Sequence, residues 1–330
     1  MMAFQTDRES PSLESLIATR SNSSLPAASL RQKWQEAFTL FRWGLTDDSG
    51  PEIFDSIFQQ LEDYRSTYER LTARSFAQAR VLEIGFGARP NRLIALMSMG
   101  MNVRGVDLDL PMLRFSPVRL LQILKRNGPE RALKTGVRSL LFDHRERAIL
   151  RTALQRRGYN MQIDPARFLE GDAATCDYGP EPLDLVYSEE VFEHIPRSGL
   201  ETLVARLAEQ VSPHGLLLIT PNIFTGITGG HLLEWYLHAV TEYTPKRSEP
   251  WEHLRKRRFT ANCYLNGLSR ADYRDLFGGH FHILEENVIE PDLGRNWLTP
   301  EVKAELAQWS EDELLSNSVR FVLRPKADRS

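Results

Sequence analysis

The sequence is poor in cysteine, in long apolar runs and in net charge, and each scarcity excludes a class of protein. Only Cys176 and Cys263 occur in 330 residues, far apart and without the spacing of metal ligands, which argues against a disulfide framework or a zinc site. No apolar run approaches the roughly 18 residues of a membrane span, and the N-terminus has no signal-peptide core. We therefore expect a cytoplasmic protein.

Charge and composition describe an ordinary globular chain. A net charge of −3 and a pI near 6.3 provide no overall attraction to polyanions. The contents of 42% hydrophobic and 26% charged residues are those of a folded protein. This length can hold one large domain or two of ordinary size, so the function must be sought in the motifs.

The stretch from residue 79 to residue 109 is the most informative part of the chain. Residues 81–84 are apolar apart from one glutamate and predict a strand, which leads directly into Gly85 and Gly87. Glycines lack a Cβ atom, so the chain can turn sharply there and a ligand can approach the backbone N–H groups at a helix start. This pattern predicts a nucleotide-binding loop.

An acid follows at the end of the next predicted strand. Residues 91–99 carry apolar side chains at helical spacing, residues 102–106 predict a strand, and Asp107 comes directly after it. The acid lies about twenty residues past the first glycine, where a carboxylate can accept hydrogen bonds from both ribose hydroxyls. Pro90 stands where a dinucleotide fingerprint has its third glycine, which disfavours a nicotinamide enzyme.

Three later segments continue the same sheet. Residues 166–174 predict a strand that ends in Gly-Asp-Ala at 171–173. Residues 183–188 predict a fourth strand, and residues 216–220 a fifth that follows a Ser-Pro-His-Gly turn at 212–215. We also expect a helix over 269–277, strands over 281–288 and 318–323 paired as an antiparallel hairpin, and a helix over 300–315 between those strands.

Taken in order, these motifs resemble those of class I S-adenosylmethionine (SAM) methyltransferases. The likeness covers roughly residues 79–222, apart from a basic insertion. It implies a Rossmann-like, seven-stranded α/β sheet with SAM as the cofactor. The cofactor-binding residues that it implies are Glu83, Gly85, Gly87, Asp107, Leu108, Asp172, Ala173, Ser188 and Glu189.

The same resemblance implies a catalytic histidine. Residues 188–195 read SEEVFEHI, similar to the "ExLEHV" segment of ubiquinone-type and many sugar O-methyltransferases, and the likeness places His194 at the mouth of the site. Methylation of a hydroxyl requires removal of its proton, and an imidazole titrates near the working pH. His194 is thus the candidate base and His231 its reserve, unless His194 caps a short helix with Glu193 as its partner. Metals are not required, and we expect no metal site.

The segments outside the motifs divide the chain further. Residues 1–26 predict a flexible tail, and residues 27–75 a helical cap with helices near 28–43 and 51–72. A cap of this kind resembles that of many small-molecule methyltransferases and either covers the cofactor or packs on the sheet edge. Residues 76–330 would form the methyltransferase domain.

A basic helical insertion is expected over residues 111–158. Between residues 114 and 157 there are twelve Lys or Arg residues and only three acids. This segregation suits an anionic partner such as a sugar nucleotide, a lipid-linked pyrophosphate, a membrane surface or RNA. The alternative is a solvated helical face whose cations pair with the acidic remainder of the protein.

The segment 223–268, which we call the lid, is rich in aromatic residues and histidine. In the family that it resembles, this stretch covers the methyl-transfer site. Arg89 would contact the methionine carboxylate or an anionic acceptor, or it would point outward. The lid residues could instead form an ordinary aromatic core. The candidate acceptor-binding residues are Arg89, His231, Glu234, Trp235 and Tyr236.

The function predicted from these features is SAM-dependent O-methylation of a small polar acceptor. Aromatic side chains mixed with His, Glu and Arg suit a saccharide or a lipid-linked glycan precursor. Amino-methylation of nucleic-acid bases is disfavoured, because residues 188–191 lack the Asn/Asp-Pro-Pro-aromatic motif. An RNA methyltransferase that uses the basic insertion and a SAM-binding scaffold without activity remain the alternatives.

Overall fold

The computed structural model describes residues 50–113, 116–141, 143–236, 240–241, 246, 248–255 and 264–326. The predicted tail over 1–26 and the predicted helix over 28–43 lie outside the described residues. The second predicted cap helix is present as a short 3-10 turn over Pro51–Phe54 followed by helix α3 (Asp55–Thr72).

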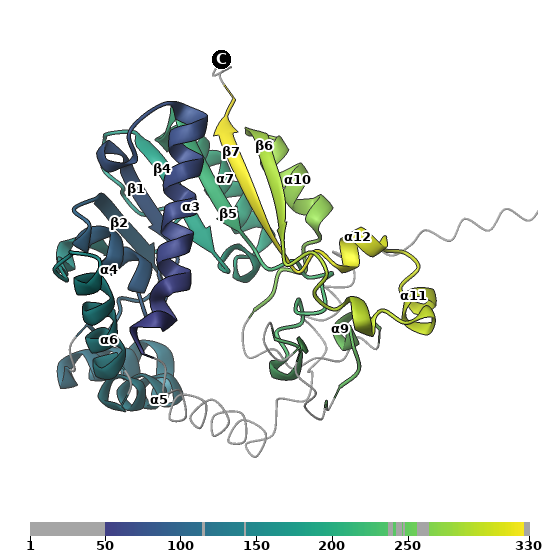
Figure 1. Ribbon diagram of the computed structural model, residues 1–330. Coiled ribbons are helices and arrows are strands. Elements are labelled where there is room, and N and C mark those ends of the chain that lie inside the picture. The colour runs from purple at the N-terminus through teal and green to yellow at the C-terminus, as the bar shows by residue number, and fades with distance from the viewer. Residues whose placement is uncertain are drawn as a thin grey trace, which may run out of the picture.

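Seven strands among the described residues form one sheet in the order β3-β2-β1-β4-β5-β7-β6 (Figure 1). The strands are β1 (Arg80–Ile84), β2 (Asn102–Asp107), β3 (Phe168–Glu170), β4 (Leu183–Glu189), β5 (Val211–Thr220), β6 (Phe281–Ile289) and β7 (Ser318–Pro325). The first five are parallel, whereas β7 is antiparallel to both of its neighbours. This order with one reversed strand is typical of the class I methyltransferase fold, so the predicted fold class is confirmed.

Helices cover both faces of the sheet (Figure 1). On one face, α3, α4 (Asn91–Ser98) and α6 (Asp143–Arg156) pack on alternate strand residues such as Val81 and Val103. On the other face, α7 (Arg197–Gln210) and α10 (Arg270–Gly278) pack on a second core cluster. This cluster includes Leu82, whose side chain points to the opposite face from that of Val81. The central strands β1, β4 and β5 are largely buried on both faces and therefore contain runs of apolar residues in the sequence.

Two predicted details are wrong. The turn expected over 212–215 is part of β5, which already pairs with β4 at Val211 and absorbs the extra residues as a register shift. The single helix expected over 300–315 is two short helices, α11 (Pro300–Glu305) and α12 (Glu311–Leu314). Thr299 and Ser310 each accept a backbone N–H at the start of one of them, so the second cap restarts the helix.

The segment that was predicted to be a basic insertion contains two helices. It comprises α5 (Pro117–Leu141), which is interrupted where Gly128 adopts φ 82°, and α6. Two of its cations pair with acids where the second cap helix begins: Arg156 lies 2.5 Å from Glu52, and Arg157 lies 2.6 Å from Asp55. These two contacts agree with the alternative prediction, in which the basic residues pair with acids of the protein itself. No helix within the described residues is long and apolar enough to cross a bilayer.

The lid has a hydrophobic cluster of its own. Trp235 and Trp251 are buried among Leu298, Val302 and Leu314, which belong to the connection between β6 and β7. Helices α9 (Glu252–Arg255) and α11 lie beyond the carboxyl ends of the parallel strands (Figure 1). The lid is thus held by packing that is separate from the two cores of the sheet.

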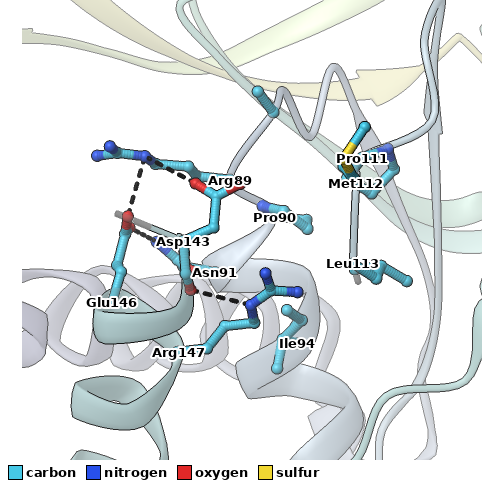
Figure 2. Close-up of a pocket in the computed structure, with 11 residues that line it drawn as sticks. Arg89, Pro90, Asn91, Ile94, Pro111, Met112, Leu113, Asp143, Glu146 and Arg147 are labelled. Atoms are coloured by element: carbon cyan, nitrogen blue, oxygen red, sulfur yellow. Dashed lines mark hydrogen bonds and ion pairs between the residues drawn. The ribbon is translucent and has the colours of Figure 1, made fainter. Parts of the chain in front are cut away.

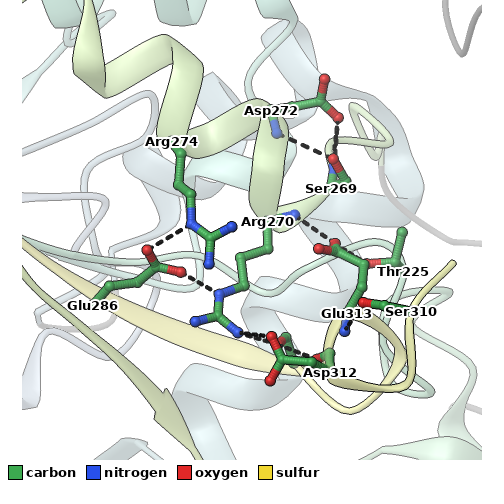
Figure 3. A network of polar contacts seen from close by, with 10 residues as sticks. Thr225, Ser269, Arg270, Asp272, Arg274, Glu286, Ser310, Asp312 and Glu313 are labelled. Atoms are coloured by element: carbon green, nitrogen blue, oxygen red, sulfur yellow. Dashed lines mark hydrogen bonds and ion pairs between the residues drawn. The ribbon is translucent and has the colours of Figure 1, made fainter.

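A buried arginine on α10 joins β6 to α12 and, through Glu313, to the lid (Figure 3). The Arg270 guanidinium binds Glu286 on β6 and lies 2.9 Å from Asp312 on α12. Glu313 accepts hydrogen bonds from the backbone N–H of Arg270 at 2.8 Å and from the hydroxyl of Thr225 at 2.7 Å. This network anchors the first residues of the lid to the sheet.

Candidate functional site

The predicted cofactor motifs meet at one edge of the sheet, where the parallel strands end. The Gly85 N–H donates to the Val106 carbonyl at 2.8 Å, and the Gly87 N–H donates to Oδ2 of Asp107 at 2.8 Å. The Gly171 N–H donates to the backbone carbonyl of Asp107 at 2.9 Å. The glycine loop, the acid that ends β2 and the Gly-Asp-Ala segment therefore touch one another, and we call this region the cofactor edge.

The two glycines of the loop differ in what surrounds them. Both adopt positive φ, 76° at Gly85 and 64° at Gly87, which disfavours any side chain. A Cβ on Gly85 would lie 2.3 Å from Val191, whereas no described atom lies within 4 Å of a Cβ placed on Gly87. Gly85 therefore permits close packing against the segment after β4, and Gly87 leaves open space beside Asp107.

Two further cofactor candidates are accessible at the same edge. Asp172 is exposed, and its Oδ1 accepts the Ala174 N–H at 2.8 Å in a tight turn after β3. Leu108, directly after β2, is 73% exposed. An exposed carboxylate and an exposed apolar side chain flanking Asp107 suit a ligand that has a polar edge and an apolar face.

Glu83, by contrast, is buried beneath the glycine loop. Its Oε1 lies 3.4 Å from Nε of Arg92, on the first turn of α4. Burial raises the pKa of Glu83, and the Arg92 cation and the Tyr187 hydroxyl offset part of that rise. The structure thus places Glu83 where it supports the loop from below.

The two candidates at the end of β4 also make contacts within the protein. The buried Ser188 hydroxyl donates to the Ile84 carbonyl at 2.9 Å and joins β4 to β1. Glu189 accepts hydrogen bonds from the hydroxyl of Tyr64, on α3, and from that of Thr220 at 3.1 Å. Burial raises the pKa of Glu189. The cap helix therefore reaches the end of β4.

Beyond β4, the structure brings together the two predicted catalytic histidines and one carboxylate, a group that we call the acceptor cluster. Oε1 of Glu193 lies 4.0 Å from Nε2 of His194 and 4.0 Å from Nε2 of His231. The two imidazole rings meet edge to face, 5.2 Å between centroids. The lid thus carries His231 to the short 3-10 helix Phe192–His194 that follows β4.

The environment of the acceptor cluster determines how its members are protonated. Nδ1 of His194 lies 2.9 Å from the Tyr264 carbonyl, which can only accept, so Nδ1 carries the proton and Nε2 of the neutral ring keeps its lone pair. Burial lowers the pKa of His231 to about 4, with a smaller contribution from His194. Burial also raises the pKa of Glu193 to about 8, and neighbouring Glu190 adds to that rise.

The remaining lid candidates divide into two groups. Tyr236 lies beside the acceptor cluster: its ring is 6.0 Å from that of His231, and its hydroxyl is 3.4 Å from Oε2 of Glu190. Trp235 is buried in the core of the lid, and Glu234 accepts a hydrogen bond of 2.6 Å from a serine of the same lid. Trp235 and Glu234 therefore stabilise the lid, while Tyr236 and His231 face the site.

Arg89 connects the glycine loop to the basic insertion (Figure 2). Its Nε lies 2.9 Å from Glu146 and 3.9 Å from Asp143, both on α6, and its side chain is 48% exposed. It lines a cavity between the loops that follow β1 and β2 and the start of α6, together with Pro90, Asn91, Ile94, Pro111, Met112, Leu113 and Arg147. The structure thus pairs Arg89 with carboxylates of the protein.

Two residues were not assigned a functional role from the sequence. Glu193 was considered only as a partner for His194, although the spacing of Glu190 and Glu193 before a histidine is a visible signal. Tyr64 lies 125 residues from Glu189 in the chain, and nothing near either residue predicts their hydrogen bond. Contacts of this kind depend on how α3 packs across the sheet.

No family model and no curated protein matches the chain. Among solved structures, it is similar to the PH0226 protein from Pyrococcus horikoshii OT3, with 14% identity over 81% of this chain and 90% of that one, at a TM-score of 0.41. It is also similar to a SAM-dependent methyltransferase from Clostridium acetobutylicum ATCC 824, with 8% identity over 88% of this chain and 98% of that one, at a TM-score of 0.42. A third similar structure, a putative SAM-dependent methyltransferase from Listeria monocytogenes, has 13% identity over 79% of this chain and 97% of its own, at a TM-score of 0.41. We therefore base the fold on the order and direction of the strands.

Proposed function

We propose that this protein is a SAM-dependent methyltransferase that methylates a hydroxyl of a small polar acceptor. The observation that carries the proposal is the contact of the glycine loop with Asp107 and of Asp107 with the Gly171 N–H. These groups lie at the carboxyl ends of adjacent parallel strands, where α/β sheets of this type bind nucleotides. The acceptor cluster follows β4, the next strand of the sheet.

The cofactor edge offers a partner for each part of SAM. Asp107 would accept hydrogen bonds from the ribose hydroxyls, and the space beside Gly87 would admit that sugar. The Asp172 carboxylate would accept a hydrogen bond from the adenine amino group, and the exposed Leu108 side chain would cover the adenine ring. SAM supplies an electrophilic methyl group on a sulfonium. The protein must hold it in line with the acceptor oxygen, about 3 Å from it.

The acceptor cluster supports a hydroxyl acceptor. His194 presents Nε2 with its lone pair, because Nδ1 donates to the Tyr264 carbonyl. A group in that position can take or direct the proton that leaves the acceptor hydroxyl. Tyr236 and Glu190 add a phenol and a carboxylate beside it. Several polar groups next to aromatic edges suit a saccharide or the glycan part of a lipid-linked precursor.

Calorimetry of the purified protein tests the cofactor first. We expect binding of SAM and S-adenosylhomocysteine but not of NADH, and at least a 100-fold loss of affinity in Asp107→Ala. Asp275→Ala is the matched control, because Asp275 is an exposed carboxylate on α10, away from the cofactor edge. Preference for NADH, or equal SAM affinity in Asp107→Ala, would refute the proposal. Once SAM binding is established, radioactive methyl transfer to saccharide acceptors tests the substrate class.

A further inference from the structure

The acceptor cluster has the composition and geometry of a metal site. One oxygen of Glu193 and one nitrogen each from His194 and His231 all lie within 4.8 Å of one another. Two imidazoles and one carboxylate are a common set of protein ligands that leaves coordination positions open. With bonds of about 2.1 Å, ligand atoms on one ion lie about 3 to 3.4 Å apart, so small side-chain movements would bring these three onto one ion.

His194 is already oriented as metal-bound histidines are. Its Nδ1 donates to the Tyr264 carbonyl, and the opposite nitrogen points toward Glu193. A hydrogen bond from the non-coordinating nitrogen to a carbonyl is the usual support for a metal-bound imidazole, because it selects the tautomer and the ring orientation. The contact with Tyr264 thus prepares Nε2 of His194 to act as a ligand.

Glu193 supplies the second argument. It is 3% exposed, and in the described part of the chain neither of its carboxyl oxygens makes a well-formed hydrogen bond. Leaving a buried carboxyl in this state costs free energy, and proteins normally compensate such a group with a cation or with hydrogen-bond donors. The two imidazoles of the cluster lie 4.0 Å from this carboxyl, too far for an ordinary hydrogen bond. The backbone N–H groups of Glu193 and Asn222 act only weakly on this carboxyl, and a cation among the three side chains would give it a strong partner.

We propose that Glu193, His194 and His231 bind one divalent transition-metal ion, such as Mn²⁺, Fe²⁺, Co²⁺ or Zn²⁺. Mg²⁺ and Ca²⁺ prefer ligand sets made of oxygen alone, whereas two imidazoles favour first-row transition metals. His231 reaches the site from the lid and the other two ligands follow β4, so the site is complete only when the lid is in place. This proposal replaces the expectation, drawn from the sequence, that the protein has no metal site.

The binding site rests on the cluster alone, whereas a role for the ion in catalysis rests on the proposed function. An acceptor hydroxyl that occupies an open position would lose its proton more readily, as water does on such ions. With its Nε2 on the ion, His194 would serve as a ligand and not as the base, so the O–H bond breaks and its proton passes to solvent. The oxygen lone pair forms the new C–O bond, and the C–S bond breaks with its electron pair left on sulfur, which yields S-adenosylhomocysteine.

Co²⁺ is the probe that tests the site, because its visible absorption reports nitrogen and oxygen coordination. The full chain is treated with EDTA, desalted and titrated with Co²⁺, and the bound metal is counted by elemental analysis after dialysis against Zn²⁺. We expect one ion per chain. We also expect affinity to fall about 100-fold or more in Glu193→Gln and His231→Ala, since each removes one of three ligands. His280→Ala is the matched control, as His280 is an exposed histidine after α10.

Each result decides one of the two proposals. Absence of Co²⁺ and Zn²⁺ binding to the wild-type chain, or binding unchanged in both variants, would overturn the metal site. Circular dichroism and thermal melting identify a variant that fails to fold, and the wild-type titration does not depend on any variant. SAM calorimetry on the EDTA-treated protein separates the failures: SAM binding without metal binding leaves the proposed function standing, and metal binding without SAM binding leaves only the site.

Discussion

The cofactor edge and the acceptor cluster belong to one candidate site but are built in different ways. At the cofactor edge, backbone groups at the ends of adjacent strands touch directly, as in the hydrogen bond from the Gly85 N–H to the Val106 carbonyl. At the acceptor cluster, a side chain of the lid meets side chains that follow β4, and the lid is packed on a core of its own. The first region depends on chain geometry, and the second on the docking of a separate segment.

This difference predicts that damage to one region leaves the other intact. The largest effect is expected at Gly85, where a side chain meets both a positive φ and Val191. We expect Gly85→Ala to lower the free energy of unfolding by about 3 kcal/mol, the sum of backbone strain and overpacking. Gly87→Ala should cost only about 1 kcal/mol, because it meets strain without a clash. Urea denaturation of both variants measures these losses, and equal losses would contradict the conclusion that only Gly85 packs closely against Val191.

The second prediction separates the acceptor cluster from the cofactor edge. We expect His194→Ala to lower the rate of methyl transfer by at least about 100-fold, the range for loss of a group that acts on the transferred proton. Its affinity for SAM should stay within about twofold, because no contact at the cofactor edge involves His194. Rates from radioactive methyl transfer and affinities from calorimetry are compared in the same preparation. Near-normal turnover would remove His194 from the mechanism.

The third prediction concerns the link between the cap and the sheet. Tyr64→Phe keeps the ring against Tyr187, 5.0 Å between centroids, and removes only the hydrogen bond to Glu189. We expect a loss of about 1.5 kcal/mol in the free energy of unfolding, since a buried carboxyl loses a donor. Tyr159→Phe, at an exposed tyrosine, is the matched control for thermal or urea unfolding. A loss no larger than in the control would mean that the bond contributes nothing.

The smallest effect is expected at Glu286, outside both regions. Burial acts to raise its pKa, but hydrogen bonds from Arg274 and Arg270 outweigh burial and hold the pKa below its ordinary value. The stability gained is therefore present above the unfolded pKa and is lost as the pH falls through the lowered value. We expect Glu286→Gln to cost about 1 kcal/mol at pH 7, and this difference should shrink in acid. Urea unfolding midpoints of the wild type and of Glu286→Gln, measured at pH 7 and in acid, test this prediction, with Asp275→Asn as the control.

The fold could be predicted from the sequence because its signals are local. Residues 81–84, the glycine loop and Asp107 lie within one short stretch, and strand β2 ends as predicted at the acid. The first error arises because a Ser-Pro-His-Gly sequence favours a turn locally, whereas pairing of Val211 with Leu183 keeps it extended. The second error arises from a local signal: one helix was expected over 300–315, whereas the cap at Ser310 starts a new helix.

The candidate site was only partly predictable, because its contacts join distant segments. The sequence indicated His194 and His231 as separate alternatives, and only the packing of the lid places both beside Glu193. Trp235 and Tyr236 are neighbours of the same aromatic type, yet one is buried in the lid and the other faces His231. Periodicity cannot distinguish the roles of two adjacent aromatic residues.

The hydrogen bond between Tyr64 and Glu189 has a consequence for exchanging parts between proteins of this fold. A helix that precedes the first strand looks like a detachable module when only the order of the chain is considered. Here its removal would leave the carboxylate at the end of β4 without its tyrosine and would uncover apolar residues of β5 and α4. A chimera that takes its cap from another protein therefore needs a matched pair, in which the incoming helix brings a donor for Glu189 or the strand gives up the acid.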